Sequence, residues 1–357
     1  MRAAATALLL AALAPTVSGC AARQAFLQRV SAKERVRHGG APVANTGTTG
    51  LTADGATVTN LKELPPPDGS VPATALGAAA SDPAAAVAAP GSGASPAMQF
   101  LYGSGEAAAL DYQAYLGLID LMIAKSSDRA VGQKVLSVVL TPAATLTAPK
   151  FASCEGKPLA AVFDVDETAL LNVGFEADDA QHPGRPYDQA RWERWERSGQ
   201  NAVVATPGMI EVARVAKASG VTLVFNTNRQ TANAAATVVA LDRAGLGPIE
   251  HGNNLWLQGD EGTGAGKDSR RTAIAAKYCV IAMAGDQLGD FSDLFNTPGR
   301  SPAARRALAT GNTIKTMWGH GWFILPNPVY GTALKGAVDD IFPAEKRWND
   351  PLPTGAK

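Results

Sequence analysis

The sequence has few of the residues on which several classes of protein depend. Its four histidines, His38, His182, His251 and His320, are scattered and show no zinc-binding spacing, which argues against a transition-metal hydrolase. Its 32 basic and 32 acidic residues give a formal net charge of +0, so the chain as a whole does not attract nucleic acid. We therefore expect no nucleic acid polymer among its partners.

Long apolar runs are also scarce, and the clearest one lies at the amino terminus. Residues 3–14 are almost wholly apolar and follow Met1-Arg2; the run is too short to span a bilayer and is typical of a secretory signal. It ends in Val17-Ser18-Gly19-Cys20, which resembles a bacterial lipobox. We predict a lipoprotein signal peptide at residues 1–19 and lipidation of Cys20. The alternative is an ordinary signal peptidase site beside an unrelated cysteine.

A lipid on Cys20 would hold the protein on a membrane without any spanning helix. Ala21, rather than aspartate, follows the cysteine, which by resemblance to such lipoproteins fits a bacterial outer membrane. Residues 20–97 are rich in alanine, glycine and proline and poor in large apolar residues, so they cannot bury enough surface to offset their ordering entropy. We predict a disordered tether there. The folded domain is expected at residues 98–357, in the periplasm or at the cell surface.

The first chemically informative segment begins with Leu159–Phe163, an apolar run typical of a buried parallel strand. Asp164 and Asp166 follow its end, where open α/β sheets place their ligands. Two carboxylates at this spacing lie on one face of an extended segment, which is costly unless a cation or a shared proton relieves them. The alternative is a helix cap at Asp166 or Thr168, which explains one acidic residue but not both.

A second strand-like run, Val221–Phe225, is followed by Thr227-Asn228-Arg229. The hydroxyl, amide and guanidinium of these three residues can donate hydrogen bonds to phosphate oxygens. In isolation, Thr227 and Asn228 are better explained as the cap of a helix at residues 231–244. The segment alone therefore favours the cap over a phosphate-binding role.

A third apolar run, Cys279–Ala284, ends in Gly285-Asp286, and Asp290 would reach the same pocket through a turn. Mg²⁺ prefers oxygen ligands, keeps several waters and needs only one or two carboxylates plus a substrate phosphate. The acidic residues at these strand ends therefore favour a Mg²⁺ site.

In their order along the chain, these segments and Lys267 resemble the motifs of the haloacid dehalogenase superfamily of phosphatases. More narrowly, the chain resembles the class C nonspecific acid phosphatases, which are bacterial surface lipoproteins that dephosphorylate nucleoside 5′-monophosphates. The resemblance covers residues 99–335 and includes four further stretches: Tyr112-Gln113-Ala114-Tyr115, Trp192-Glu193-Arg194-Trp195, Thr206-Pro207-Gly208, and Leu325-Pro326-Asn327-Pro328-Val329-Tyr330-Gly331.

The sequence departs from the family pattern at two places. Leu170-Leu171-Asn172 stands where the family usually has Leu-Asp-Asn, so any role of that acid is absent. The family commonly shows Lys-Ser-x-Lys around its lysine, whereas this chain has Lys267-Asp268-Ser269-Arg270. Lys267 is thus the only local candidate for the lysine role.

The resemblance implies a role for each motif residue. Asp164 would attack phosphorus and form an aspartyl phosphate, and Asp166 would protonate the leaving alkoxide. The implied phosphate-binding residues are Thr227, Asn228 and Lys267. The implied Mg²⁺ ligands are Asp164, the backbone carbonyl of Asp166, and Asp286. Asp290 and Arg270 would orient these groups without binding the metal or the phosphate directly.

The resemblance also implies an α/β fold with a Rossmann-like parallel sheet and a small, mainly helical cap. The cap is expected at about residues 172–205, with a contribution from residues 98–130. Aromatic side chains near the motifs could stack on a nucleobase. We assign this stacking role to Trp195 and Tyr330, and favour a packing role for Trp192.

We thus expect a membrane-anchored, Mg²⁺-dependent acid phosphatase that hydrolyses small phosphomonoesters. The alternative is a non-catalytic surface lipoprotein that binds nucleotide or haem on the same fold. A homodimer and a monomer both remain open. Cys154 and Cys279 could form a disulfide in an oxidising compartment, but Cys279 lies in an apolar, strand-like run, so we favour free thiols.

Overall fold

The computed structural model describes residues 50–51, 57–58, 93–262 and 264–349. It divides the chain into two compact units, Met1–Ser92 and Gly93–Lys357. In the first unit, strands β1 (Gly50–Leu51) and β2 (Thr57–Val58) pair in antiparallel fashion within the segment predicted to be a tether. The predicted signal peptide, Cys20 and most of residues 20–97 lie outside the described residues. The second unit begins at Gly93, slightly before the boundary expected at residue 98.

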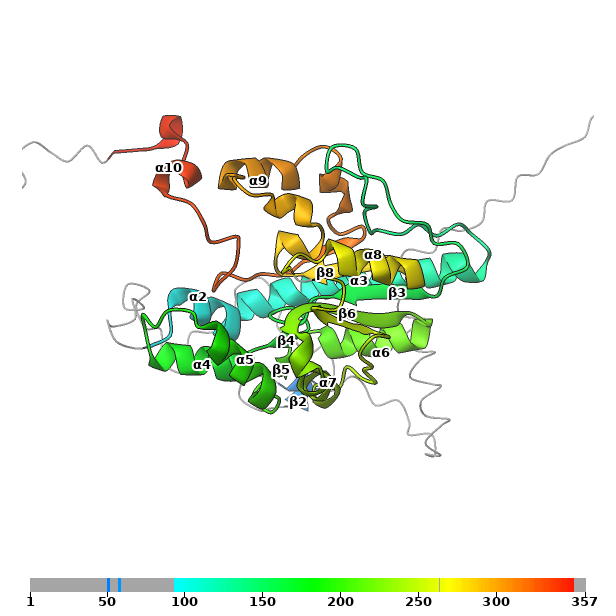
Figure 1. Cartoon of the computed structure of the whole chain (residues 1–357), viewed down its shortest axis with the longest axis horizontal. Coiled ribbons are helices and arrows are strands. Elements are labelled where there is room, and N and C mark those ends of the chain that lie inside the picture. Colours follow the sequence, from blue (N-terminus) through cyan, green and yellow to red (C-terminus); the bar gives the residue numbers. More distant parts are fainter. Residues whose placement is uncertain (1–49, 52–56, 59–92, 263, 350–357) are drawn as a thin grey trace, which may run out of the picture. The chain divides into compact units, whose positions relative to one another are not determined.

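A five-stranded parallel sheet forms the centre of the second unit (Figure 1). Its strand order is β7-β6-β3-β8-β9, with the bounds β3 (Leu159–Phe163), β6 (Thr222–Gln230), β7 (Leu255–Gln258), β8 (Cys279–Gly285) and β9 (Trp322–Ile324). The predicted α/β fold with a parallel sheet is confirmed, as are the strands expected at residues 159–163 and 279–284. The strand expected at residues 221–225 is also present, but β6 continues to Gln230 and includes the three residues that were expected to follow it. The short strand β7 was not predicted.

Helices and short turns surround this sheet, and Figure 1 shows α8 and α6 on opposite sides of it. The helices are α2 (Pro96–Met98), α3 (Gly105–Ala130), α4 (Val173–Gln181), α5 (Gln189–Ser198), α6 (Met209–Ser219), α7 (Ala234–Arg243), α8 (Asp268–Lys277), α9 (Pro302–Ala309) and α10 (Val338–Ile341). The π-helical turn η3 (Gln99–Gly103) precedes α3, and the 3-10 turns are η4 (Thr231–Asn233), η5 (Leu288–Asp290), η6 (Asp293–Asn296), η7 (Ile314–Met317) and η8 (Ala344–Lys346).

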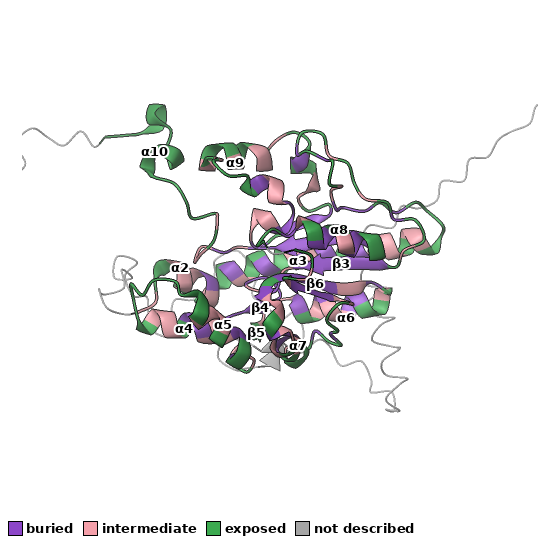
Figure 2. Cartoon of the chain, in the orientation of Figure 1, coloured by how far each residue is buried: buried purple, intermediate pink, exposed green. Residues whose placement is uncertain are grey.

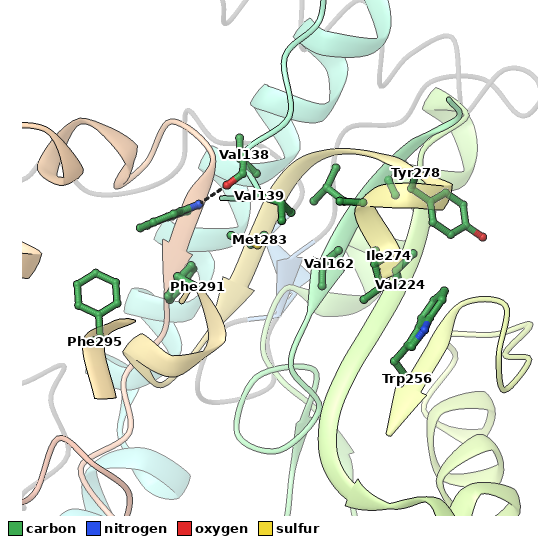
Figure 3. Packing of buried hydrophobic residues seen from close by; sticks show 14 of the residues in the cluster. Val138, Val139, Val162, Val224, Trp256, Ile274, Tyr278, Met283, Phe291 and Phe295 are labelled. Atoms are coloured by element: carbon green, nitrogen blue, oxygen red, sulfur yellow. Dashed lines mark hydrogen bonds between the residues drawn. The ribbon is translucent and has the colours of Figure 1, made fainter. Parts of the chain in front are cut away.

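Alternating side chains of β3 fill two apolar layers, because successive residues of a strand point to opposite faces. Val162 belongs to a cluster with Ile274 of α8, shown in Figure 3, where Trp322 donates its indole N–H to the carbonyl of Val138 (2.9 Å). Phe163 lies on the other face, where the centre of its ring is 6.4 Å from the centre of the Tyr115 ring of α3. The sheet is therefore buried on both sides, as Figure 2 shows.

Helix α3 is long and apolar enough to cross a membrane by length and composition. Its apolar residues Leu118, Ile119 and Met122 are, however, fully buried in the folded unit. Its length and composition are therefore explained by its position as a core helix.

The region expected to form the cap contains α4, α5 and β5 (Val204–Ala205). Strand β5 pairs in antiparallel fashion with β4 (Leu170–Leu171), which lies just before this region. The rings of Phe175 on α4 and Trp192 on α5 pack edge to face, with their centres 5.0 Å apart, and so join the two helices. This region lies beside the carboxyl ends of the central strands (Figure 1).

Cys154 and Cys279 form a disulfide, so of the two alternatives that we left open, the favoured one, free thiols, was wrong. Cys279 is the first residue of β8, so it lies at the amino end of the strand, whereas Asp286 follows the carboxyl end. Cys154 lies in the loop before β3, and the neighbouring Pro158 accepts the backbone N–H of Cys279 (2.8 Å). The loop therefore runs beside the start of β8, which the apolar run of Cys279 gave no means to foresee.

Candidate active site

The carboxyl ends of two adjacent central strands bring the predicted acidic residues together. Asp164 follows β3, Asp286 follows β8, and Asp290 ends the turn η5. One carboxylate oxygen from each of these residues lies within 4.8 Å of the others. Gly285 permits this approach, because a Cβ at that position would lie only 2.2 Å from the Cβ of Asp290.

Lys267 joins the acidic cluster from the start of α8. Its ammonium donates to Asp164 Oδ1 (2.6 Å) and to Asp290 Oδ1 (2.7 Å), and its side chain is 6% exposed. Burial by itself would lower the pKa of Lys267, but the two carboxylates outweigh burial, and the net shift is upward. The lysine is therefore charged, and its third N–H is available to a ligand.

Asp164, Asp286 and Asp290 carry more negative charge than Lys267 can balance. Burial raises the pKa of Asp164 well above its usual range; Lys267 opposes this shift, whereas Asp290 and Asp286 add to it. Burial, followed by the charge of Asp290, raises the pKa of Asp286 to about 7. A cluster of carboxylate oxygens with unbalanced negative charge fits a hard divalent cation.

Three side chains on different segments hold the carboxylate of Asp286 in place. Thr168 donates its hydroxyl to Oδ1 (3.2 Å), while Gln287 (2.9 Å) and Asn327 (2.8 Å) donate side-chain amides to Oδ2. Asn327 lies in the stretch Leu325–Gly331 that carried part of the family resemblance. Its contact with Asp286 gives this stretch a physical role that the sequence alone did not show.

Asp166 lines the same cavity and is fixed by a buried guanidinium. Arg229 Nη2 donates to Asp166 Oδ1 (2.7 Å) and Nε donates to the same oxygen (3.0 Å). Asn172 donates its amide N–H to Oδ1 (2.9 Å) and accepts from Arg229 (3.0 Å). We expected Arg229 to offer hydrogen bonds to phosphate, but its guanidinium is engaged with Asp166 and Asn172 instead.

The carboxyl-terminal part of β6 contributes an amide rather than a hydroxyl to the cavity wall. Asn228 lines the cavity, whereas Thr227 is fully buried and is not among the lining residues; its hydroxyl accepts the backbone N–H of Arg229 (3.1 Å). Arg270 lies behind both residues and donates to the carbonyl of Thr227 and to Asn228 Oδ1 (2.5 Å). Because Arg270 binds the amide oxygen, the NH₂ group of Asn228 is left to face a ligand.

These groups line a cavity of about 1550 Å³ beneath the cap region. Its polar lining includes Asp164, Asp166, Lys267, Asp286 and Asp290. Its aromatic lining consists of Phe175, Tyr187, Trp192 and Tyr330. The cavity is larger than most small-molecule sites, which measure about 300 to 1,000 Å³.

Of the two aromatic residues predicted to stack on substrate, only Tyr330 lines this cavity. Trp195 is not among the lining residues: its indole N–H donates to Asn172 (3.1 Å), and its ring packs on Phe175 and against Gly199. The structure thus places Trp192, three residues earlier on α5, at the cavity wall, and a stacking role for any of these rings stays a prediction.

Glu167 is a buried residue of the site that sequence reasoning missed. Its carboxylate accepts hydrogen bonds from the hydroxyls of Tyr102 (3.1 Å) and Tyr330 and from the backbone N–H of Asn172 (2.9 Å). It has a positive φ of 51°, which turns the chain sharply after Asp166. Glu167 therefore joins two distant segments, through Tyr102 and Tyr330, to the turn that follows Asp166. Its position after Asp-x-Asp was the only signal that could have marked it.

Comparisons with known proteins identify the family of this chain. Residues 125–333, more than half of the chain, match the family described as HAD superfamily, subfamily IIIB (Acid phosphatase). The class C acid phosphatase from Bacillus anthracis is similar in structure, with 26% identity and a TM-score of 0.52. The similarity covers 66% of this chain and 84% of that one, and a second structure of that enzyme, with tungstate bound, gives the same values. A comparison with curated proteins finds no match.

The matched family and the similar solved structures are acid phosphatases. The cluster of Asp164, Lys267 and Asp286 at the strand ends has the chemistry that such an enzyme needs. HAD phosphatases act on phosphate esters with a divalent metal, and the acidic cluster has the ligand type for such an ion. This chain belongs to the HAD superfamily, subfamily IIIB, and is an acid phosphatase.

Proposed function

We propose that this acid phosphatase hydrolyses nucleoside 5′-monophosphates and related small phosphomonoesters, with Mg²⁺ at the acidic cluster. The observation that carries the proposal is the contact of Lys267 with both Asp164 and Asp290 beside Asp286. This arrangement sets an acidic nucleophile, a charged donor and a metal-binding carboxylate around one point. Phosphoryl transfer needs these three elements, since it depends mainly on positioning and charge stabilisation.

The phosphoryl group would lie between Lys267 and Asn228. The free N–H of Lys267 and the free NH₂ group of Asn228 would donate to its oxygens, and Asp164, Asp286 and the carbonyl of Asp166 would hold Mg²⁺. The metal would supply charge neutralisation for the phosphoryl oxygens. The tungstate bound to the Bacillus anthracis enzyme supports an oxyanion site in the relative that this chain resembles.

The reaction would proceed in two displacements at phosphorus. In the first, an oxygen of Asp164 attacks phosphorus, the bond to the leaving oxygen breaks, and Asp166 gives that oxygen its proton. In the second, Asp166 takes a proton from water, the water oxygen attacks phosphorus, and the bond to Asp164 breaks to release phosphate. Arg229 and Asn172 would keep Asp166 aimed at the leaving oxygen throughout.

The leaving alcohol would occupy the cavity between the sheet and the cap region. Its volume of about 1550 Å³ admits a nucleoside, and Trp192 and Tyr330 offer aromatic surface for a base. The hydroxyl of Tyr330 is bound by Glu167, so the ring is already oriented before a ligand arrives. A preformed aromatic wall favours flat leaving groups.

The substrate and metal assignments predict a chelator-sensitive phosphatase. Phosphate release should be measured from a nucleoside 5′-monophosphate and an aryl phosphate, before and after treatment with EDTA. We expect hydrolysis of both, a loss of about 10²-fold or more on chelation, and recovery with added Mg²⁺. Unchanged turnover in EDTA would remove the metal assignment. Tight binding of nucleotide without any hydrolysis would favour a binding protein on this fold.

We also propose that Cys20 anchors the protein to the outer membrane through lipid, with the phosphatase domain outside the cytoplasm. The disulfide between Cys154 and Cys279 supports an oxidising compartment. In a bacterial host, Cys20→Ala should move the protein from the membrane fraction to the soluble or precursor fraction, with Cys154→Ala as a matched control that stays on the membrane. An unchanged distribution of the Cys20→Ala variant would refute the anchor.

A further inference from the structure

Glu176 is a buried carboxylate of the cap region that the mechanism above does not use. It lies on α4, is 6% exposed, and lines the cavity next to Phe175. Within residues 93–262 and 264–349, no hydrogen bond or ion pair reaches its carboxylate. It is therefore a nearly buried carboxyl group that faces the substrate cavity without a protein partner among the described residues.

The cationic group that acts on Glu176 already has other partners. Arg191 forms ion pairs with Asp178 (2.6 Å) and Asp179 (2.7 Å), and its guanidinium lies 4.0 Å from the centre of the Phe175 ring. Burial, followed by the charge of Asp179, raises the pKa of Glu176 to about 7, and Arg191 lowers it only in part. A buried carboxylate without a partner is unfavourable, so a group that enters the cavity would relieve it.

The surroundings of Glu176 indicate which chemistry would do so. Phe175 and Trp192 present aromatic surface to the same cavity, and Asp179 adds a further carboxylate near Glu176. The phosphate end of a substrate is assigned to Lys267 and Asn228, so its other end lies towards the cap. Carboxylates beside aromatic rings recognise donors of hydrogen bonds, and positively charged nitrogen most strongly.

We propose that Glu176 is a specificity-determining residue that accepts a hydrogen bond from an N–H or O–H group on the leaving alcohol. The substrates are then phosphomonoesters whose alcohol has a donor group away from the reacting oxygen, with an ammonium favoured over a neutral donor. Amino or hydroxyl groups of a nucleoside satisfy the same requirement. This inference rests on the proposed function.

The test uses four phenyl phosphates that differ only at the para position: 2-aminoethyl, 2-hydroxyethyl, ethyl and carboxymethyl. Their leaving groups react similarly, so differences in kcat/KM report on the distant substituent. For the wild-type protein we expect the order ammonium, hydroxyl, ethyl, carboxylate, with about a ten- to hundredfold advantage of ammonium over ethyl. In Glu176→Gln that advantage should fall below about threefold, and the carboxymethyl ester should improve.

Glu193→Gln is the matched control, because it removes another carboxylate from the same cavity. The carboxylate of Glu193 already accepts the side-chain amide of Gln189 (3.2 Å), so this variant should keep the wild-type order. If both variants change the order equally, the general negative charge of the cavity is responsible and the assignment to Glu176 is overturned. An equal rate for all four esters in the wild type overturns it as well.

Thermal unfolding gives a second readout. Removing an unpartnered charge should leave the Tm of Glu176→Gln unchanged or higher, whereas a lower Tm would reveal an internal partner and contradict the proposal. The two hypotheses also fail in different ways. Hydrolysis of none of the four esters would contradict the proposed function, while hydrolysis of all without discrimination would contradict only the role of Glu176.

Discussion

Replacing Asp164 by asparagine should abolish phosphate release, with a loss of at least about 10⁴-fold in kcat. The carboxylate follows the central strand β3 and accepts the ammonium of Lys267 (2.6 Å), so its oxygen is fixed at the strand end. Asparagine has nearly the same shape but is a poor nucleophile for phosphorus. The measurement is phosphate release under substrate saturation, together with acid-quenched trapping of phosphorylated protein.

Ligand binding by the Asp164→Asn variant distinguishes loss of the nucleophile from loss of the whole site. Asp164→Asn removes one negative charge from a cluster with an excess of carboxylates, so tungstate or phosphate should still bind to it. Asp128→Asn is the control: this carboxylate contacts Lys125 on α3, remote from the strand ends, and its loss should leave activity unchanged. Phosphorylated protein in the Asp164→Asn variant would show that another residue is the nucleophile.

The sequence predicted the part of the site that depends on strand ends. Asp164 and Asp286 each follow an apolar run, and parallel strands bring their carboxyl ends to one edge, so their meeting follows from topology. The family resemblance added Lys267, which has no local pattern of its own. The strand β7 was missed because its four residues, Leu255–Gln258, are too few to show a reliable period.

Side-chain direction was the main source of error. Trp195 and Trp192 are three residues apart on α5 and lie within one turn, so sequence spacing could not say which faces the cavity. Arg229 was expected at the phosphate but turns towards Asp166, because β6 continues to Gln230 and adjacent residues of a strand point to opposite faces. Such choices depend on tertiary contacts that one sequence does not display.

The disulfide and Glu167 escaped prediction for a different reason. Both join segments that are far apart in the chain: Cys154 meets Cys279, and Glu167 meets Tyr102 and Tyr330. The apolar run around Cys279 was compatible with a free thiol or a bridge. A carboxylate that follows Asp-x-Asp gave no sign of its tyrosine partners.

Replacing Lys267 by methionine should lower kcat/KM by about 10²- to 10³-fold, by analogy with the loss of one donor to a developing oxyanion. Methionine keeps much of the length and apolar stem of lysine, so the variant removes mainly the charge. The effect on stability should also be large. Breaking a buried ion pair costs about 3–5 kcal/mol, because Asp164 and Asp290 would be left without the ammonium. Activity and urea unfolding without metal measure the two effects.

Added Mg²⁺ makes this test specific to the acidic cluster. With Lys267 gone, Asp164, Asp286 and Asp290 have a larger excess of negative charge, so a divalent cation should stabilise the variant more than it stabilises the wild type. Lys277→Met, at the exposed end of the same helix, is the control and should change neither activity nor the response to metal. If the Lys267→Met variant is unstable and Mg²⁺ does not stabilise it, Mg²⁺ does not bind at the acidic cluster. The metal would then have to lie elsewhere in the cavity.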